Sequence, residues 1–123
     1  MSHGQPRQRI ILIKTAKPML KDIDDIDKKC RKLLIAKNHD YASSEDPYKN
    51  LRQSEQIGIP AWKGTFIRYL DKHSRMCNFI LKGEYAVKDE NFEDTIDDAL
   101  NYLKLVKILY KRNEVEQENK KNT

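Results

Sequence analysis

Carboxylates gather in residues 84–98, where seven acidic residues accompany a single lysine. The acidic residues that share one side of a helix built from this stretch are Glu90, Asp94, Asp97 and Asp98. Side chains one turn apart have Cβ atoms about 5–6 Å from each other, and carboxylates this close repel unless a cation lies between them. Mg²⁺ takes oxygen ligands and leaves positions for substrate phosphates. The pattern predicts a magnesium site with Glu90, Asp94 and Asp98 as ligands, and these three with Asp97 are the candidate catalytic residues.

A solvated helix face is the more common explanation of such a charged run, and it stays open here. The polar side of this helix, however, continues into Leu105 and Ile108, where a solvated face would stay polar. We therefore expect this side to be covered by another helix or another subunit. Asn101 lies on the same side and is a candidate for substrate contact.

Lysine and arginine side chains occur in the apolar-periodic segment of about residues 60–83, which precedes the acidic segment. Lys72 and Arg75 can neutralise phosphate oxygens, and Asp71 beside them would join the metal carboxylates. The alternative is that Asp71 and Arg75 form only an i, i+4 ion pair, which stabilises a helix by about 0.2–0.5 kcal/mol.

The segment from residue 38 to residue 52 carries more hydrogen-bonding groups than a connection needs. Side chains suited to a base edge, a stacked ring, a sugar and a phosphate are Asp40, Tyr41, Asn50 and Arg52. Polar residues on loops between rigid elements often serve recognition. A simpler explanation is a helix C-terminus followed by an N-cap at Asp46-Pro47.

Apolar residues recur every three or four positions, which is the spacing of one face of an α-helix. We expect helices over about residues 18–37, 46–58, 60–83 and 89–112, with Gly58 and Gly83 as C-caps and Asp89 as an N-cap. The expected inner stripes are Met19, Ile23, Ile26, Cys30 and Leu33 in the first helix, Trp62, Phe66, Leu70, His73, Cys77 and Ile80 in the third, and Phe92, Ile96, Ala99, Leu103, Val106 and Tyr110 in the fourth.

The expected fold is all-α, an antiparallel bundle of about four helices that forms one domain over residues 18–112. Residues 1–17 lack helical periodicity and are expected as a basic arm or a short strand, and residues 113–123 as a polar, disordered tail. Helices three and four carry apolar residues on two sides, so we expect a homo-oligomer. Phe79, Leu105 and Ile108 should lie near a contact between subunits or helices.

Composition excludes several classes of protein. The chain has 123 residues, enough for one domain, and 35% of them are charged, with a net charge of +5. Cys30 and Cys77 belong to no CxxC or Cys/His cluster, so neither a structural zinc nor a disulfide scaffold is expected. The apolar run at residues 10–13 is shorter than a signal peptide core or a membrane span. We expect a cytoplasmic protein without membrane association.

Four short motifs occur in a fixed order along residues 26–110, namely KNHDY at 37–41, DPYKNLR at 46–52, DKHSRM at 71–76 and DENFEDTIDDALNY at 89–102. Together they resemble a phage and prophage family, the first of the nucleotide-modification-associated domains. That family is similar to the all-α nucleoside triphosphate pyrophosphatases of the MazG and dimeric dUTPase type, whose acidic residues bind magnesium. The resemblance implies that Asn38 and Tyr102 belong to the substrate site, and that a phage-encoded chain would act in the host cytoplasm.

The leading hypothesis is a magnesium-dependent protein that hydrolyses a (deoxy)nucleoside triphosphate to the monophosphate and pyrophosphate. Two alternatives stay open. One is a protein that binds or sequesters a nucleotide without catalysis. The other, which the residues favour less, is a nucleic-acid-binding module that uses the basic segments 1–17 and 28–39.

Overall fold

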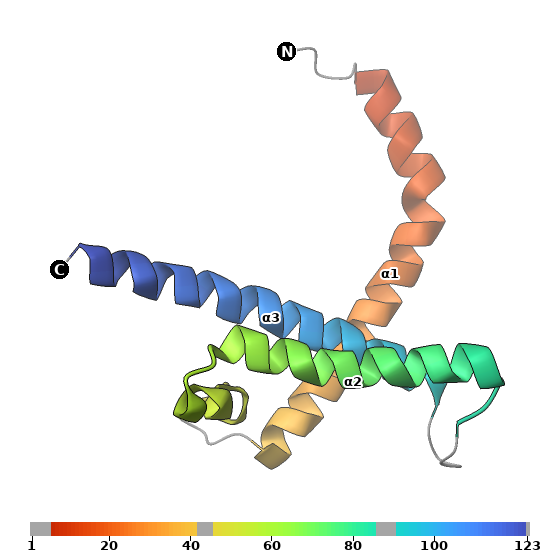
Figure 1. The fold of residues 1–123 in the computed structure, drawn as a ribbon. Coiled ribbons are helices and arrows are strands. Elements are labelled where there is room, and N and C mark those ends of the chain that lie inside the picture. Colours follow the sequence, from red (N-terminus) through yellow and green to blue (C-terminus); the bar gives the residue numbers. More distant parts are fainter. Residues whose placement is uncertain (1–5, 42–45, 86–90, 123) are drawn as a thin grey trace.

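The computed structural model describes residues 6–41, 46–85 and 91–122, and within the first range it describes the side chains of residues 16–37. The elements are α1 (Pro6–Tyr41), the 3₁₀ helix η1 (Lys49–Ile57), α2 (Ala61–Lys82) and α3 (Phe92–Lys121) (Figure 1). The described ranges contain no β-strand, so the expected all-α class is confirmed. Among their helices none is long and apolar enough to cross a membrane.

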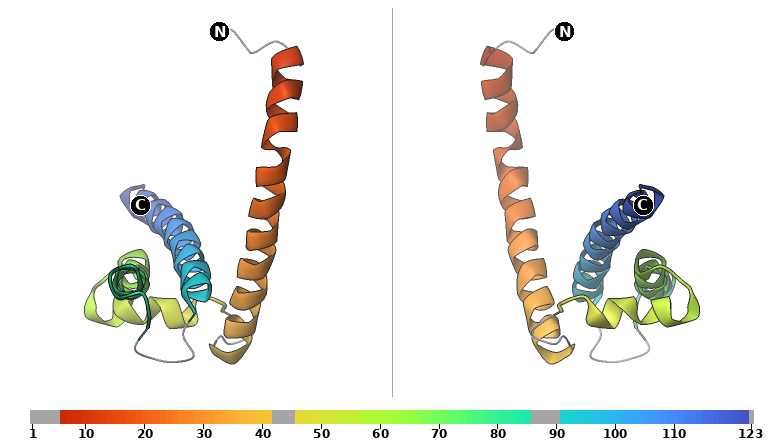
Figure 2. Two further views of the ribbon diagram at one scale, coloured as in Figure 1. Left: turned by 90° about the vertical axis from the view of Figure 1, so that its right-hand side faces the viewer. Right: turned by 90° about the vertical axis from the view of Figure 1, so that its left-hand side faces the viewer.

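The body of the molecule is an antiparallel hairpin of α2 and α3, which make the most extensive contact between any two elements (Figure 1). The second half of α1 crosses α3, and η1 packs against α2. The first half of α1 stands away from the hairpin, as both side views show (Figure 2). In the described part of the chain, α1 therefore contacts the hairpin through its second half, where it crosses α3.

Small and polar residues make most of the buried core. The fully or nearly buried residues are Cys30, Ala61, Thr65, Thr95, Asp97, Ala99, Asn101 and Leu109. Small side chains allow helices to approach closely, and the threonine hydroxyls donate to carbonyls of their own helices, Thr65 to Ala61 at 2.8 Å and Thr95 to Asn91 at 3.0 Å. Aromatic contacts hold both ends of the hairpin, with Phe79 stacked on Phe92 at 4.6 Å and Trp62 edge-on to Tyr110 at 5.2 Å between ring centroids.

A glycine fixes how closely η1 approaches α2. A Cβ atom built on Gly64 would lie 2.4 Å from the Ser54 hydroxyl oxygen and 2.8 Å from the Ser54 Cβ. The Ser54 hydroxyl donates to the Ile59 carbonyl at 3.1 Å, which holds it against this point. Gly64 lowers the helix propensity of α2, but its missing side chain allows η1 and α2 to pack closely.

The boundaries of α2 agree with the sequence, whereas those of α3 and η1 are shifted. Gly58 and Gly83 are left-handed C-caps with φ of 80° and 77°. The N-cap of α3 is Asn91, whose side chain accepts from the backbone N–H of Glu93, so Asp89, which lies outside the described residues, is not the cap. The second helix begins at Lys49 rather than at Pro47, because the Asp46 carboxylate accepts from the Tyr48 N–H and forms a turn first.

Both chain ends are more helical than expected. Residues 6–17 are not an arm or a strand but the first turns of α1, which starts at Pro6 and continues through Pro18. Proline at the first helical position has a suitable φ, and the Arg, Gln, Ile, Leu and Lys residues after it are acceptable helix formers. At the other end, residues 113–121 belong to α3, where Glu and Gln favour helix and Lys120 and Lys121 complement the dipole. The first helix also ends at Tyr41, not near Lys37.

The expected inner stripe of α2 is wrong over most of its length. Trp62 is half-buried, but the exposed members of that stripe are Phe66, Leu70, His73, Cys77 and Ile80. The face toward α3 instead consists of Ala61, Thr65, Tyr69, Lys72, Met76 and Phe79. The face of α2 that packs against α3 is therefore not its most apolar face. It begins with the small residues Ala61 and Thr65, which allow the two helices to approach closely. The first helix behaves alike, since Cys30 is buried while Met19, Ile23 and Ile26 are exposed.

Candidate functional site

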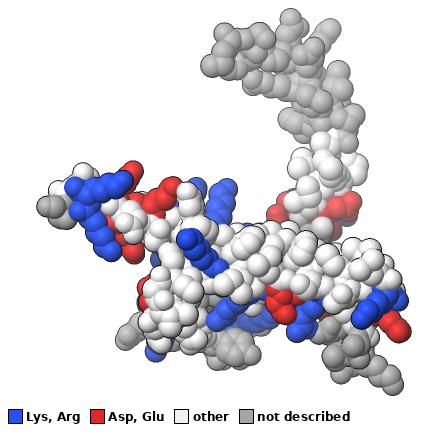
Figure 3. All heavy atoms as spheres, in the orientation of Figure 1, with Lys and Arg blue, Asp and Glu red and all other residues white. Residues whose placement is uncertain are grey.

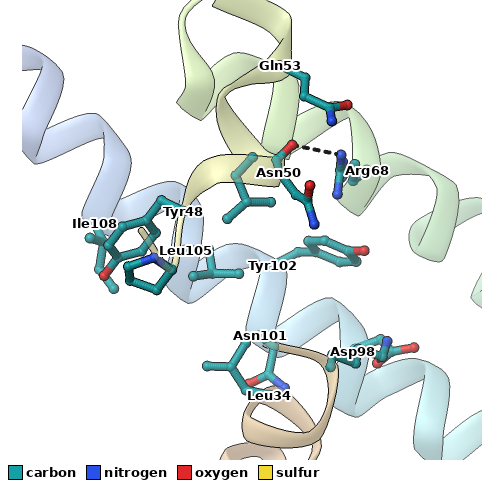
Figure 4. A pocket seen from close by; sticks show the side chains of 13 residues that line it. Leu34, Tyr48, Asn50, Gln53, Arg68, Asp98, Asn101, Tyr102, Leu105 and Ile108 are labelled. Atoms are coloured by element: carbon teal, nitrogen blue, oxygen red, sulfur yellow. Dashed lines mark hydrogen bonds and ion pairs between the residues drawn. The ribbon is translucent and has the colours of Figure 1, made fainter. Parts of the chain in front are cut away.

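A cleft of about 620 Å³ opens where the end of α1, η1, α2 and α3 come together (Figure 4). Its lining residues are Leu34, Lys37, Pro47, Tyr48, Asn50, Leu51, Gln53, Arg68, Asp98, Asn101, Tyr102, Leu105 and Ile108. The α3 residues among them recur every three or four positions, so they form one stripe along that helix. Part of this second side of α3 is therefore covered by α1 and η1, as expected for Leu105, whereas Ile108 stays 38% exposed.

Asp98 forms the charged end of the cleft. Its carboxylate is within 2.7 Å of the Lys37 Nζ from α1 and 3.3 Å of the Lys72 Nζ from α2. The Asp98 side chain is only 16% exposed, so these ion pairs are less screened than surface pairs. With two ammonium groups on one carboxylate, this end of the cleft has a net positive charge.

A second depression of about 360 Å³ adjoins the cleft and shares Lys37 and Asp98 with it. Its other lining residues are Lys29, Lys32, Leu33 and Asp94. The Lys29 Nζ lies 2.9 Å from Asp94 and 3.3 Å from Asp97. The hydrogen bond to Asp94, followed by that to Asp97, raises the pKa of Lys29. The lining of this depression therefore has three lysines and two aspartates, and we call it the lysine groove.

A buried polar layer connects α1 to α3 behind the charged end. The Asn101 Nδ2 donates to the Cys30 carbonyl at 2.8 Å, and the Cys30 Sγ lies 3.6 Å from an Asp97 carboxylate oxygen. Burial, and then the charge of Asp97, raise the pKa of the Cys30 thiol. The Asn101 Oδ1 is buried and finds no hydrogen-bond partner among the residues that the structure describes.

The other end of the cleft is apolar and aromatic. Leu105 and Ile108 of α3 lie beside Tyr48 (Figure 4), and Pro47 also lines the cleft. The guanidinium of Arg112 lies over one face of the Tyr48 ring, 4.4 Å from its centroid. This cation–π contact holds the ring in place. At the edge between η1 and α2, the Arg68 Nη2 donates to the Asn50 carbonyl at 3.1 Å.

The structure brings part of the sequence-predicted site together. Asn50, Asp98, Asn101 and Tyr102 line the cleft, and Lys72 reaches Asp98 at its edge. Asp94 and Asp97 lie on the neighbouring side of α3, where both pair with Lys29. The described carboxylates Asp94, Asp97 and Asp98 therefore do lie near one another on α3, but each of them forms an ion pair with a lysine.

Other predicted residues lie elsewhere. Arg52 forms an ion pair with Asp46 and does not line the cleft, although it borders a depression on η1 that shares Gln53 with the cleft. Asp71 and Arg75 form the i, i+4 pair that was the alternative, at 3.2 Å on an outer part of α2. Glu90 and the side chains of Asn38, Asp40 and Tyr41 lie outside the described residues, although the backbone of the latter three belongs to α1.

Several cleft residues were not predicted as site residues from the sequence, notably Lys37, Tyr48 and Arg68. Lys37 falls seven residues after Cys30, so it continues the buried side of α1 and could have been placed by that spacing. Tyr48 and Arg68 gave no such signal, because their positions depend on how η1 folds back onto α2 and α3.

The chain matches no protein-family model, and no curated protein and no solved structure is significantly similar to it. The resemblance to the phage family therefore stays a prediction that is carried by its four motifs.

Proposed function

We propose that this protein binds a nucleotide in the cleft, with the phosphates at Lys37 and Lys72 beside Asp98 and the base at Leu105 and Ile108. The observation that carries the proposal is the order of side chains along one stripe of α3, from a charged end with excess lysine to an apolar, aromatic end. A nucleotide has the same order of chemical groups. The volume of about 620 Å³ also lies in the range of small-molecule sites.

The lysines supply the phosphate interactions. Lys37 and Lys72 already converge on Asp98, and Lys29 and Lys32 extend the positive charge into the lysine groove. Hydrogen bonds between an ammonium group and a phosphate oxygen are among the stronger ones in proteins. A chain of phosphates that leaves the cleft past Lys37 would enter the lysine groove, which favours a di- or triphosphate over a nucleoside.

The apolar end suits a base. Tyr48 offers an aromatic face beside Leu105 and Ile108, and Arg112 on the ring holds it in place. Aromatic and aliphatic side chains form most of the contact surface in small-molecule sites, with a few polar groups that set orientation.

We propose further that Mg²⁺ binds with the nucleotide and that the bound triphosphate is hydrolysed to the monophosphate and pyrophosphate. Asp94 and Asp98 stand one turn apart on α3 and both border the lysine groove. Mg²⁺ commonly takes one or two carboxylates together with substrate phosphates, so these two residues fit it. Bound there, Mg²⁺ would polarise a phosphoryl oxygen and lower the pKa of a bound water.

Non-catalytic binding is the second candidate, and a specific observation favours it. Asp94, Asp97 and Asp98 each have a lysine ammonium group within 3.3 Å. On this alternative the carboxylates serve to position the lysines that bind phosphate.

Two measurements on the same protein separate these candidates. Isothermal titration with nucleoside triphosphates is expected to give saturable binding, and added Mg²⁺ is expected to give pyrophosphate release. Binding without release at any Mg²⁺ concentration would favour the non-catalytic candidate. Absence of binding to every common triphosphate would refute the proposed function.

We also propose that the protein associates with a second copy of itself. The face of α2 that points away from α3 exposes Phe66, Ile67, Leu70, Ile80 and Leu81, of which Ile80 and Leu81 are 70% and 83% exposed. Figure 3 shows an uncharged surface along much of α2. A contiguous apolar surface of this kind is typical of protein contacts, and α1 presents a second such stripe at Met19, Ile23 and Ile26.

A further inference from the structure

The side-chain carbonyl of Asn101 is a buried acceptor without a partner in the wall of the cleft. Asn101 is only 6% exposed and lines the cleft between Leu34 and Tyr102 (Figure 4). The described residues offer its Oδ1 no hydrogen-bond donor. Such orphaned buried groups are uncommon in proteins because each loses its interactions with water without replacement.

The hydrogen bond of the Asn101 Nδ2 fixes the orientation of the side-chain amide. The Nδ2 donates to the Cys30 carbonyl at 2.8 Å, and a carbonyl oxygen can only accept. A flipped amide would place two acceptors against each other. The atom left over is therefore the Oδ1, and the group that satisfies it must donate a hydrogen bond.

Asn101 lies between the two ends of the cleft. It follows Asp98 by three residues and precedes Leu105 and Ile108 by four and seven residues on the same stripe of α3. At about 1.5 Å per residue, Asn101 stands about 4–5 Å along the helix from the charged end and about 6–10 Å from the apolar residues. In a nucleotide, the group at that place between phosphates and base is the sugar, whose hydroxyls are donors.

We infer that the Asn101 Oδ1 accepts a hydrogen bond from a sugar hydroxyl of the bound nucleotide, and so selects ligands that carry it. This inference rests on the proposed nucleotide site and adds the group by which the sugar is recognised. The Oδ1 is itself buried, so a half-buried neighbour at the edge of the cleft, Leu34 or Tyr102, must move aside when the ligand binds. Tyr102, predicted in the substrate site from the motif resemblance, is then next to the sugar.

The test is a ligand series on the unmodified protein. ATP, GTP, CTP and UTP are titrated calorimetrically in the presence of Mg²⁺ as α,β-non-hydrolysable analogues, which prevents turnover without removing the metal. The tightest of them is then compared with its 2′-deoxy, 3′-deoxy and 2′,3′-dideoxy forms. The dideoxy form is expected to bind about tenfold more weakly, the effect of one lost hydrogen bond in a buried site. The monodeoxy form that shows the same loss identifies the hydroxyl.

A variant then assigns the effect to Asn101. Asn101→Leu keeps the volume but removes the acceptor, and it should bind the hydroxylated and dideoxy forms equally. If Asn101→Leu does not fold, the ligand series on the unmodified protein decides.

Three results would overturn the inference. Equal affinity of the unmodified protein for the hydroxylated and dideoxy forms would refute sugar recognition while leaving the nucleotide site intact. A folded Asn101→Leu protein that still prefers the hydroxyl would assign the recognition to another residue. Failure of all four triphosphates to bind would remove the inference together with the proposed function, and is distinguished from the first result by the absence of any binding heat.

Discussion

At the scale of single residues, Asp98 joins the three long helices at one point. Its carboxylate on α3 is paired with Lys37 of α1 and Lys72 of α2. The same cluster is the charged end of the cleft. Fold and proposed function therefore depend on the same ion pairs, and a ligand phosphate would compete with Asp98 for the two lysines.

The buried layer behind Asp98 predicts how stability depends on pH. Burial and Asp97 raise the pKa of Cys30 from its ordinary value of 9.0, and hydrogen bonds to Asp94 and Asp97 raise the pKa of Lys29 from 10.5. For both groups the folded state holds its proton more tightly than the unfolded state. Their contributions are therefore complete below about pH 9 and are lost as the pH rises further.

Thermal unfolding of the unmodified protein and of Cys30→Ala between pH 8 and pH 11 measures this effect. Ala fits the small site and removes the thiol, so the melting temperature of the variant should fall less steeply above pH 9. Parallel curves would mean that Cys30 does not contribute to the loss.

At the scale of elements, α2 shows what the sequence could and could not predict. Pro60 and Gly83 set its ends correctly, because proline and glycine act through their own backbone preferences. The face that packs was missed, because Ala61 and Thr65 contribute little to an apolar stripe yet permit close contact. A single sequence shows which face is most apolar but not which partner will cover it.

In the candidate site, too, the residues that share one helix face were predictable from the sequence, whereas those brought in by tertiary contacts were not. The stripe on α3 that contains Asp98, Asn101 and Tyr102 follows from helical spacing within one element. Lys72 was predicted as well, and it reaches the stripe from α2. The contributions of Tyr48 and Arg68 depend on tertiary contacts of η1 that no local pattern encodes.

The position of η1 can be tested at Gly64. Gly64→Ala would normally stabilise a helix by about 1 kcal/mol, but here its Cβ meets Ser54. Overpacking of this kind costs about 1–3 kcal/mol, so we expect net destabilisation and weaker nucleotide binding, since η1 forms one wall of the cleft.

The control for this prediction is the double variant Ser54→Gly with Gly64→Ala, measured by urea unfolding beside both single variants. Removing the Ser54 side chain takes away both atoms that the new Cβ would meet. The alanine should therefore be much less harmful in that background. An equal effect of alanine in both backgrounds would mean that η1 does not approach α2 at Gly64.

At the scale of the whole molecule, the chain leaves two apolar stripes uncovered. The α2–α3 hairpin and the crossing of α1 bury mainly small and polar residues, while larger side chains on α1 and α2 are exposed. This distribution is unusual for a protein that stays monomeric. It is the basis of the proposed self-association. Of the residues expected near a contact between subunits or helices, Phe79 of α2 lies against Phe92 of α3, and Leu105 lines the cleft beside η1.

Light scattering tests the association. The unmodified protein at micromolar concentration should have at least twice the chain mass of 14.5 kDa. Phe66→Gln with Leu70→Gln should shift the mass toward 14.5 kDa, whereas the control Val115→Gln, at an exposed apolar position late in α3, should not. A mass of 14.5 kDa for the unmodified protein would refute the association.

The central claim, that the cleft binds a nucleotide through its phosphates at Asp98, is tested most directly at Lys72. Affinities for a nucleoside, its monophosphate and its triphosphate are measured by calorimetry for the unmodified protein, for Lys72→Met and for the control Lys107→Met, an exposed lysine of α3 that does not line the cleft. The account predicts that affinity rises with the number of phosphates. It also predicts that Lys72→Met weakens triphosphate binding by about 1.5–3 kcal/mol, with little effect on the nucleoside, while Lys107→Met leaves all three unchanged. Equal losses in both variants, or an affinity that does not depend on the phosphates, would contradict it.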